Sequence, residues 1–303
     1  MKRDTNKKYM NPTETERLLR FEYDRGTVYE EDSGASKVLD VLIPEGDLID
    51  HDQRLFQIQH LKTELSWYAI HFEIRGVIKA LQNDDFSRAS SLMERIILLA
   101  DAPYSALRLF VNTLTQSSLL RMREQLPEGA TGFDSPGMRN LKLVTRALWK
   151  AFVESLESHN HTPESLAILR SNSERIEILP DRLALLSHVY DGIQKFDVKL
   201  MEWKQLHLRM VWGHLGGAFA HLDESNELID YQFEKSRSCR YQNSAEVSDE
   251  TGYNYEIPTS LRGRPVTDLQ RVTVAPFFND LWKIPDVIYK HIKSKNDNDI
   301  ESN

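Results

Sequence analysis

The sequence predicts an all-α fold, organised as a single helical-bundle domain with a long irregular loop near its C-terminus. Along several stretches the apolar residues recur mostly at three- and four-residue steps, which is the spacing of an amphipathic helix. Glycine and proline are sparse, with 13 and 11 residues among 303. This content is low for a β-sandwich or for a glycine-rich nucleotide-binding fold, so helices are the expected elements.

The N-terminal part of the chain is polar. Residues 1–45 carry one apolar patch, at 38–43, and it ends at Pro44. Proline does not continue a helix interior, so we expect a polar N-terminal arm over 1–45 that holds one short helix. The helical domain is expected over residues 46–289, and the polar residues 290–303 are expected to form a flexible tail.

The middle of the chain carries the helical pattern. It begins at Asp52 and reaches Gln82 without a proline, and Gly76 weakens it without ending it. Prolines and turn-forming residues separate this helix from the later ones. Further helices are expected at Phe86–Ala100, at Tyr104–Leu126, at Gly137–Leu156, in a short piece after Pro163, and from Pro180 to about His221.

Two segments are predicted to be loops. Residues 126–136 are dense in turn formers, and residues 222–265 are acidic, rich in Ser and Asn, and interrupted by glycines and prolines. A loop as long as the second one is usually functional or disordered. We therefore expect residues 222–265 to lie on the active-site side of the domain. The apolar pattern returns at 266–274 and 277–289.

Charge and hydropathy exclude several classes of protein. With 38 Lys and Arg against 46 Asp and Glu, the formal net charge is −8, whereas a protein that binds nucleic acid normally carries a basic face. The apolar runs are short, as at Ile96–Ala100, and a membrane span needs about 18–20 residues. Residues Met1–Thr15 are polar and lack the apolar core of a secretory signal. We expect a soluble, cytoplasmic protein without a nucleic-acid or membrane partner.

The single cysteine, Cys239, excludes an internal disulfide framework and a Cys₄ or Cys₂His₂ zinc module. It lies in the polar stretch Ser-Arg-Ser-Cys-Arg, where the arginines would lower the pKa of its thiol. A thiolate ligand, a nucleophile and an incidental loop thiol all remain open. The sequence carries no His-Glu-x-x-His motif, no phosphate-binding loop and no Gly-x-Ser-x-Gly motif.

Three histidines share one stripe of the longest expected helix. His207, His214 and His221 are seven residues apart, which corresponds to about 10.5 Å along the helix axis for each step. They cannot bind one metal ion together, and at most one of them can bind a given iron. Three unrelated polar or core histidines fit the same spacing.

Two further positions allow more than one interpretation. His60 and Glu64 are four residues apart on the expected 52–82 helix, a spacing that suits a metal site or a surface pair. Arg139 falls in the first turn of the helix that follows the 126–136 loop. A guanidinium there can bind a carboxylate through two parallel hydrogen bonds, or it can simply be solvated.

Four parts of the chain resemble, in order, the motifs of the tryptophan 2,3-dioxygenase family. They are similar to the family's Phe-x-x-x-His with Glu-Leu-Trp and Glu-Leu-Arg, its Ser-Gly-Phe-Gln-Ser-x-x-x-Arg, its Trp-x-x-x-His-x-x-Met-Val and its Phe-Phe-x-Glu-Leu. The resemblance is collinear and covers about residues 38–288. The matching segments are Phe56 to His60 with Glu64-Leu65 and Glu73-Ile-Arg75, Thr131 to Ser135 with Arg139, Trp203 to Val211 with Gly216, and Phe277 to Leu281.

This resemblance implies a helical enzyme that encloses haem b. His207 would be the proximal ligand of the haem iron. His60 would be the catalytic residue on the distal side, near the substrate ring, with Phe56 packed one turn earlier. Arg139 would pair with the carboxylate of an aromatic amino acid. The family's members are homotetramers in which an N-terminal segment reaches a neighbour's active site, so a homo-oligomer is expected.

The chain also departs from the family's pattern. The Glu-Leu-Trp motif is Glu64-Leu65-Ser66 here, with Trp67 displaced by one residue, and Pro136 and Gly137 change the turn before Arg139. The family's Gly-Thr-Gly-Gly-Ser loop, which closes over the substrate's ammonium group, has no counterpart between 222 and 265. The departures resemble those of divergent relatives such as haem-dependent tyrosine hydroxylases and other natural-product enzymes.

These observations leave a main expectation and several alternatives. The main one is a haem-dependent oxygenase that inserts O₂ into the indole ring of L-tryptophan or of a derivative. A second is a haem-dependent hydroxylase that uses peroxide or O₂ on a tyrosine-like amino acid, with His60 as the acid–base group. A non-catalytic haem-binding sensor or scaffold is a third, and a helical interaction protein whose motifs match by chance is a fourth.

Overall fold

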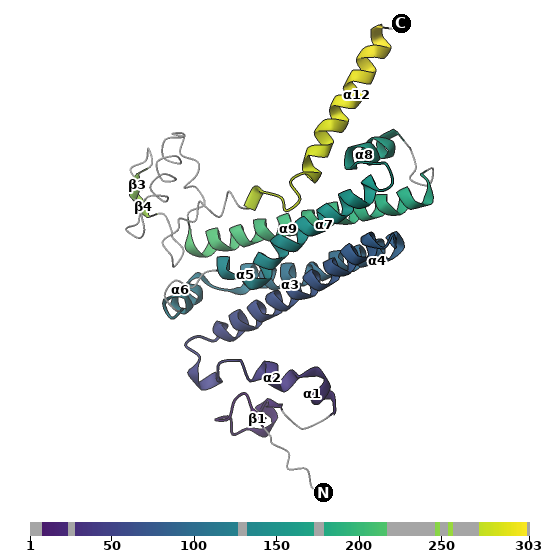
Figure 1. Ribbon diagram of the computed structural model, residues 1–303. Coiled ribbons are helices and arrows are strands. Elements are labelled where there is room, and N and C mark those ends of the chain that lie inside the picture. Colours follow the sequence, from purple (N-terminus) through teal and green to yellow (C-terminus); the bar gives the residue numbers. More distant parts are fainter. Residues whose placement is uncertain are drawn as a thin grey trace. The chain divides into compact units, whose positions relative to one another are not determined.

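The computed structural model describes residues 8–23, 28–126, 132–172, 179–216, 246–248, 254–256 and 273–301. Over these residues the fold is all-α, as predicted (Figure 1). None of the helices in the described ranges has the length and apolar character needed to cross a membrane. The expected loop 222–265 lies outside the described residues, apart from two short strands. These strands, β3 Glu246–Ser248 and β4 Asn254–Glu256, pair antiparallel.

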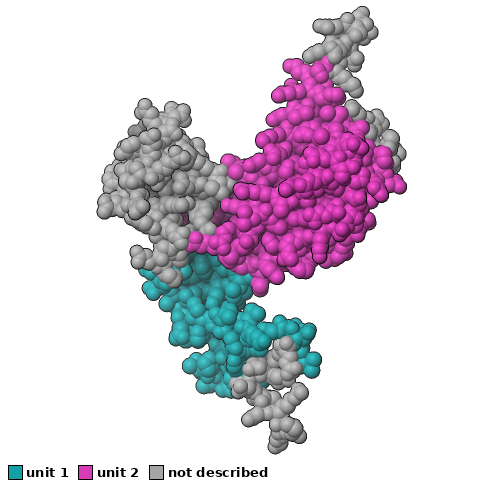
Figure 2. Space-filling view, in the orientation of Figure 1, with its two compact units in different colours: residues 1–61, 114–126 teal, residues 62–113, 127–303 magenta. Residues whose placement is uncertain are grey.

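The chain divides into two compact units (Figure 2). Unit 1 holds residues 1–61 and 114–126, and unit 2 holds residues 62–113 and 127–303. The long helix α3, Asp52–Gln82, contributes its first residues to unit 1 and the remainder to unit 2. Residues 1–45, which were expected to form a polar arm, belong to unit 1 together with residues 46–61 and 114–126. The limits of the helical domain at 46 and 289 stay predictions.

Unit 1 combines short N-terminal elements with one end of α3. Its described elements include an antiparallel strand pair whose register places Lys8 opposite Tyr23, and the expected short helix begins at Ala35 and ends at Leu39. The bounds are β1 Lys8–Tyr9, η1 Arg17–Leu19, β2 Glu22–Tyr23, α1 Val28–Ser33, α2 Ala35–Leu39, η2 Glu45–Asp47 and α6 Gln116–Glu124.

Unit 2 is a set of packed helices. Helices α4 and α5 pack along the 35-residue α9, α8 packs on α9, and α12 packs on α8 (Figure 1). The bounds are α4 Phe86–Leu99, α5 Asp101–Thr113, η3 Gly132–Asp134, α7 Pro136–Glu157, α8 Pro163–Asn172, α9 Asp181–Leu215, η5 Leu281–Lys283 and α12 Ile284–Glu301.

Three helix boundaries differ from the expected ones. The stretch expected as one helix over Tyr104–Leu126 is two helices, because Thr115 is extended and its hydroxyl caps α6 by accepting a 3.1 Å hydrogen bond from the Ser118 N–H. Helix α9 ends at Leu215 before Gly216, whose φ of 84° suits glycine. Helix α12 continues to Glu301, beyond the apolar pattern that ends near residue 289.

The core of unit 2 lies where α3, α4, α7 and α9 bury their apolar faces. Close approach of the helices depends on two glycines: a Cβ on Gly192 would lie 2.7 Å from the Met93 Cβ, and one on Gly76 would lie 3.1 Å from the Leu92 side chain. The largest fully buried side chains of this core include Trp67, Ile70, Ile74, Phe86, Met93, Ile96, Leu141, Leu148, Phe152 and Phe196.

Candidate active site

Helix α9 presents an aromatic pair at the position expected for the haem ligand. The rings of Trp203 and His207, four residues apart, stack with centroids 5.4 Å apart and planes inclined by 6°. Trp67 of α3 meets Trp203 edge-on, at 5.4 Å and 84°. His207 is half-buried, and its neighbours Leu206, Leu208 and Val211 are buried. One face of the imidazole is therefore covered by the Trp203 ring.

The indole N–H of Trp203 is a buried donor without a hydrogen-bond acceptor among the described residues. An unsatisfied buried donor costs about 1–3 kcal/mol, so it requires an acceptor such as a water, an ion or a ligand to offset this cost. The described residues hold no cluster of three or more His, Cys, Asp or Glu that could bind a bare metal ion. A haem needs only one protein ligand, because the porphyrin supplies four nitrogens. Among the described residues, His207 and the Trp203 N–H are groups that could hold a haem.

His214, on the same stripe of α9, differs from His207. His214 is 5% exposed, and its Nδ1 lies 2.7 Å from the carbonyl oxygen of Met210. A carbonyl only accepts, so the proton is on Nδ1 in the neutral ring. His221 and Cys239 lie outside the described residues.

Arg139 lies in the first turn of α7, and its side chain is exposed. Ser135 caps this helix, with its hydroxyl accepting a 3.1 Å hydrogen bond from the Met138 N–H. Pro136 occupies the first helical position, where its missing N–H costs nothing. The turn before Arg139, which Pro136 and Gly137 were expected to change, is thus a regular helix start capped by Ser135.

The two departures around this turn compensate each other. A Cβ at Gly137 would lie 2.6 Å from the Trp67 Cβ, so the start of α7 can approach α3 only because residue 137 is glycine. Trp67 is the tryptophan displaced by one residue from the family's position. It contacts Gly137 on one side and Trp203 on the other, and Trp203 stacks on His207. Trp67 therefore connects the turn before Arg139 to the neighbourhood of His207.

Glu64 binds the start of α7 through both carboxylate oxygens. It accepts a hydrogen bond from the Ser135 hydroxyl and one of 2.8 Å from the Gly137 N–H. The sequence did not indicate this role: the spacing suggested a metal site or a surface pair with His60.

His60 and Phe56 lie together on the part of α3 that belongs to unit 1. Their ring centroids are 4.1 Å apart, and the His60 Nδ1 lies 2.7 Å from the Phe56 carbonyl oxygen. Because a carbonyl oxygen only accepts hydrogen bonds, the proton of the neutral ring lies on Nδ1, and Nε2 is an acceptor. His60 is exposed and Phe56 is half-buried. Arg139 and His207 belong to unit 2.

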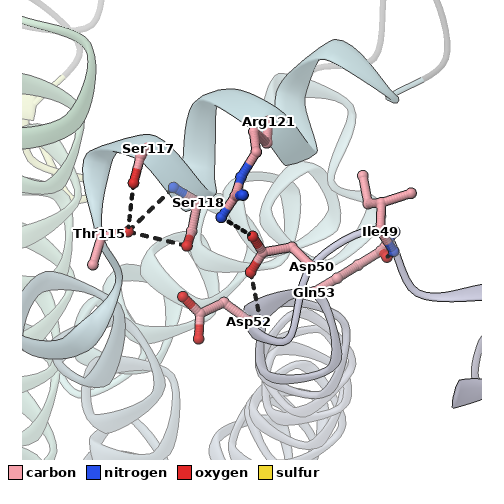
Figure 3. A network of polar contacts seen from close by, with 8 residues as sticks. All are labelled: Ile49, Asp50, Asp52, Gln53, Thr115, Ser117, Ser118 and Arg121. Carbon is pink, nitrogen blue, oxygen red and sulfur yellow. Dashed lines mark hydrogen bonds and ion pairs between the residues drawn. The ribbon is translucent and has the colours of Figure 1, made fainter.

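A polar network in unit 1 positions the first turn of α3 (Figure 3). The Asp50 carboxylate accepts a 2.9 Å hydrogen bond from the Asp52 N–H at the start of the helix, and it pairs with Arg121 of α6. The Gln53 side chain accepts a 3.0 Å bond from the Ile49 N–H. The network holds α6 against the loop that enters α3, one turn before Phe56.

A buried carboxylate on α9 organises the segment that resembles Phe-Phe-x-Glu-Leu. Asp197 is 0% exposed and accepts hydrogen bonds from the Phe277 N–H at 2.9 Å, the Phe278 N–H at 3.3 Å and the Trp282 indole N–H at 2.7 Å. Asp197 does not stand out in the amino-acid sequence as a site residue. An acidic side chain between Phe196 and Leu200 on the core stripe is the signal that could have found it.

Lys204, which precedes His207 by three residues on α9, contacts the same segment near Phe277. Its ammonium donates to the Ala275 carbonyl and lies 5.1 Å from the centre of the Phe277 ring. Burial disfavours the charged form and lowers the pKa of Lys204 to about 8, although Asp197 acts in the opposite direction.

The fold and the site define a helical protein with a half-buried, tryptophan-stacked histidine on its longest helix. No family model matches the chain. Over 138 residues it is 29% identical to the tryptophan 2,3-dioxygenase of Burkholderia ambifaria (strain MC40-6), a match that covers 46% of this chain and 43% of the relative. It is 31% identical over 139 residues to that of Bradyrhizobium sp. (strain ORS 278), covering 45% and 47%.

Over the matched residues the chain is thus similar to tryptophan 2,3-dioxygenases, the group that its motifs resemble, and the similarity supports a divergent relative of that superfamily. The chain spans less than half the length of the curated relatives that it matches.

Proposed function

We propose that this protein is a haem-dependent oxygenase that acts on an aromatic amino acid. The simplest reaction is the insertion of O₂ into the indole ring of L-tryptophan. One observation carries the proposal: Trp67 contacts both the turn that bears Arg139 and the aromatic pair that contains His207. The helix turn that bears the candidate carboxylate-binding residue and the ring stacked on the candidate iron ligand thus both meet Trp67 within unit 2.

His207 is the proposed ligand of the iron in haem b. When bound, the haem supplies the O₂ binding and redox chemistry, and the protein supplies placement. Stacking against Trp203 restricts rotation of the imidazole. The Trp203 N–H is available to donate to an acceptor on the bound group.

Arg139 is the proposed partner of the substrate carboxylate. The Gly137 and Met138 N–H groups at the start of α7 are already used by Glu64 and Ser135, and Pro136 has none. The helix terminus therefore offers no such group to an anion, which leaves the guanidinium. Two parallel hydrogen bonds from Arg139 would fix the amino acid's direction, which is catalysis by orientation.

His60 is the proposed hydrogen-bond acceptor for the substrate ring. Because its Nδ1 donates to the Phe56 carbonyl, Nε2 suits the N–H of an indole or the O–H of a phenol. The contact between the Phe56 and His60 rings restricts the imidazole further.

Replacing Arg139 by leucine should raise KM for L-tryptophan by about 10–100-fold with a smaller change in kcat, because a charge-assisted bond contributes about 1.5–3 kcal/mol. Steady-state kinetics of the haem-loaded protein measures this. Arg146, an exposed arginine on the same helix, provides the control variant Arg146→Leu, which should behave like the wild type. Equal KM values for the two variants would show that Arg139 does not bind the carboxylate.

The product of turnover tests the reaction itself. Anaerobic reduction of the haem-loaded protein, followed by O₂ and L-tryptophan, should yield N-formylkynurenine. A catechol from tyrosine with peroxide would instead establish the hydroxylase alternative. Haem binding without turnover of any aromatic amino acid would establish the sensor. The cytoplasmic location stays a prediction from the sequence.

We also propose that the protein is a homo-oligomer. Leu65, Tyr68 and Phe72 form a stripe on α3 and are 60%, 64% and 57% exposed, respectively. Contiguous exposed apolar side chains of this size are typical of a protein–protein interface. A second copy of this chain is the proposed partner.

The double variant Tyr68→Glu with Phe72→Glu should therefore dissociate the oligomer, because charges would be buried in an apolar contact. Light scattering coupled to size-exclusion chromatography measures the mass. Leu98→Glu on α4, where the leucine is 70% exposed, is the control and should keep the wild-type mass. A wild-type protein that elutes as a monomer would contradict the proposal.

A further inference from the structure

We infer that Glu64 is the positioning residue that sets the direction of Arg139 toward the substrate carboxylate. The inference rests on the proposed function of Arg139 and adds a residue to it. Glu64 lies on α3 and Arg139 on α7, and both belong to unit 2.

The first turn of α7 is held by a closed set of hydrogen bonds. Glu64 accepts from the Ser135 hydroxyl and from the Gly137 N–H, at 2.8 Å for the latter. The Ser135 hydroxyl oxygen in turn accepts from the Met138 N–H. The backbone carbonyl of Ser135 accepts from the Arg139 N–H at 3.2 Å. One carboxylate thus anchors the turn that ends at Arg139.

Packing prevents the same turn from sliding or rotating. The site where a Cβ of Gly137 would lie is 2.6 Å from the Trp67 Cβ and 2.7 Å from a Glu64 oxygen. Successive residues on a helix point about 100° apart, so a slip of one residue at this contact would aim Arg139 elsewhere. The contact with Trp67 sets the distance between the helices, and Glu64 sets the register.

The charge of Glu64 contributes as well. A carboxylate is stabilised at the N-terminus of a helix by the positive end of the helix dipole. Because Glu64 already occupies this position, a substrate carboxylate cannot replace it without displacing a charge of the same sign. The protein thereby directs the substrate's carboxylate to the Arg139 side chain, away from the backbone of α7.

The test compares binding of L-tryptophan with binding of tryptamine, which lacks the carboxylate, by spectral titration of the haem-loaded protein. Glu64→Gln keeps an acceptor for Ser135 but puts an NH₂ group against the Gly137 N–H. It should weaken tryptophan binding about tenfold and leave tryptamine binding within about twofold. Ser135→Ala should also weaken tryptophan binding selectively, and Ser135→Thr, which keeps the hydroxyl, should retain the preference for tryptophan.

Glu73→Gln is the matched control, because Glu73 lies on α3 like Glu64 but pairs with the exposed Arg95.

Hydrogen exchange of the purified protein provides a readout independent of ligand binding. The Gly137 amide should exchange about tenfold faster in Glu64→Gln than in Glu73→Gln. Unchanged exchange would overturn the inference. Equal weakening of tryptophan binding and tryptamine binding would also overturn the inference, since a merely structural role of Glu64 would give that result. If Arg139→Leu keeps the preference for tryptophan, the proposed function of Arg139 is wrong. If Arg139→Leu loses the preference and Glu64→Gln keeps it, only the inference about Glu64 is wrong.

Discussion

Replacing His207 by alanine should leave a folded protein that no longer gives the absorption spectrum of haem with an imidazole ligand. Haem affinity should fall by at least about tenfold, because the direct ligand is lost and changes to a mere supporting group already cost about 10–100-fold. Added imidazole should restore the spectrum if it can enter the space left by the side chain.

The matched control is His214→Ala, because His214 is a second histidine on the same face of α9. Its Nδ1–H bonded to a backbone carbonyl is also an arrangement found in metal-binding histidines. Wild-type spectra from His214→Ala together with a changed spectrum from His207→Ala would support the assignment. The opposite pattern would move the ligand to His214, and unchanged spectra in both variants would exclude ligation by either residue.

Replacing Asp197 by alanine should lower the free energy of unfolding by about 3–9 kcal/mol, because three donors would lose their acceptor and each unsatisfied buried group costs about 1–3 kcal/mol. Urea unfolding followed by circular dichroism measures the change. The segment 275–283 should detach in the variant, because the backbone N–H groups of both Phe277 and Phe278 donate to this carboxylate.

Asp280→Ala is the control for this experiment. Asp280 lies in the same segment, but it is exposed, and among the described residues its carboxylate pairs with the exposed Lys283, so its removal should cost less than about 1 kcal/mol. Asp197→Asn should fall between the two, because an amide keeps one acceptor oxygen. Equal stability of the Asp197 and Asp280 alanine variants would mean that Asp197 does not anchor the segment.

The helices of the middle of the chain were predictable because their signal is local. The expected helix from Asp52 to Gln82 has these bounds in the structure, since an uninterrupted apolar period without proline leaves no other boundary. The split near Thr115 was missed, although threonine followed by Gln-Ser-Ser is a typical helix start. The periodicity on both sides of Thr115 concealed the cap between them.

The candidate site was predictable only in part. His60, Phe56, Arg139 and His207 were selected from motifs, and the structure assigns each a neighbourhood while their roles stay predictions. Glu64 and Asp197 escaped because their partners lie 71–73 and 80–85 residues away in the sequence. The spacing along one helix cannot indicate which distant donor a carboxylate will meet.

The sequence by itself determined the all-α fold and the likeness to the tryptophan 2,3-dioxygenases, because helical periodicity and ordered motifs are properties of short segments. Only the tertiary structure decided that Trp67 packs between Gly137 and Trp203 and that Glu64 uses the N–H of Gly137. The physical reason is that these features depend on contacts between separate helices. There the absence of one Cβ and the position of one carboxylate determine how closely two helices approach and where Arg139 lies.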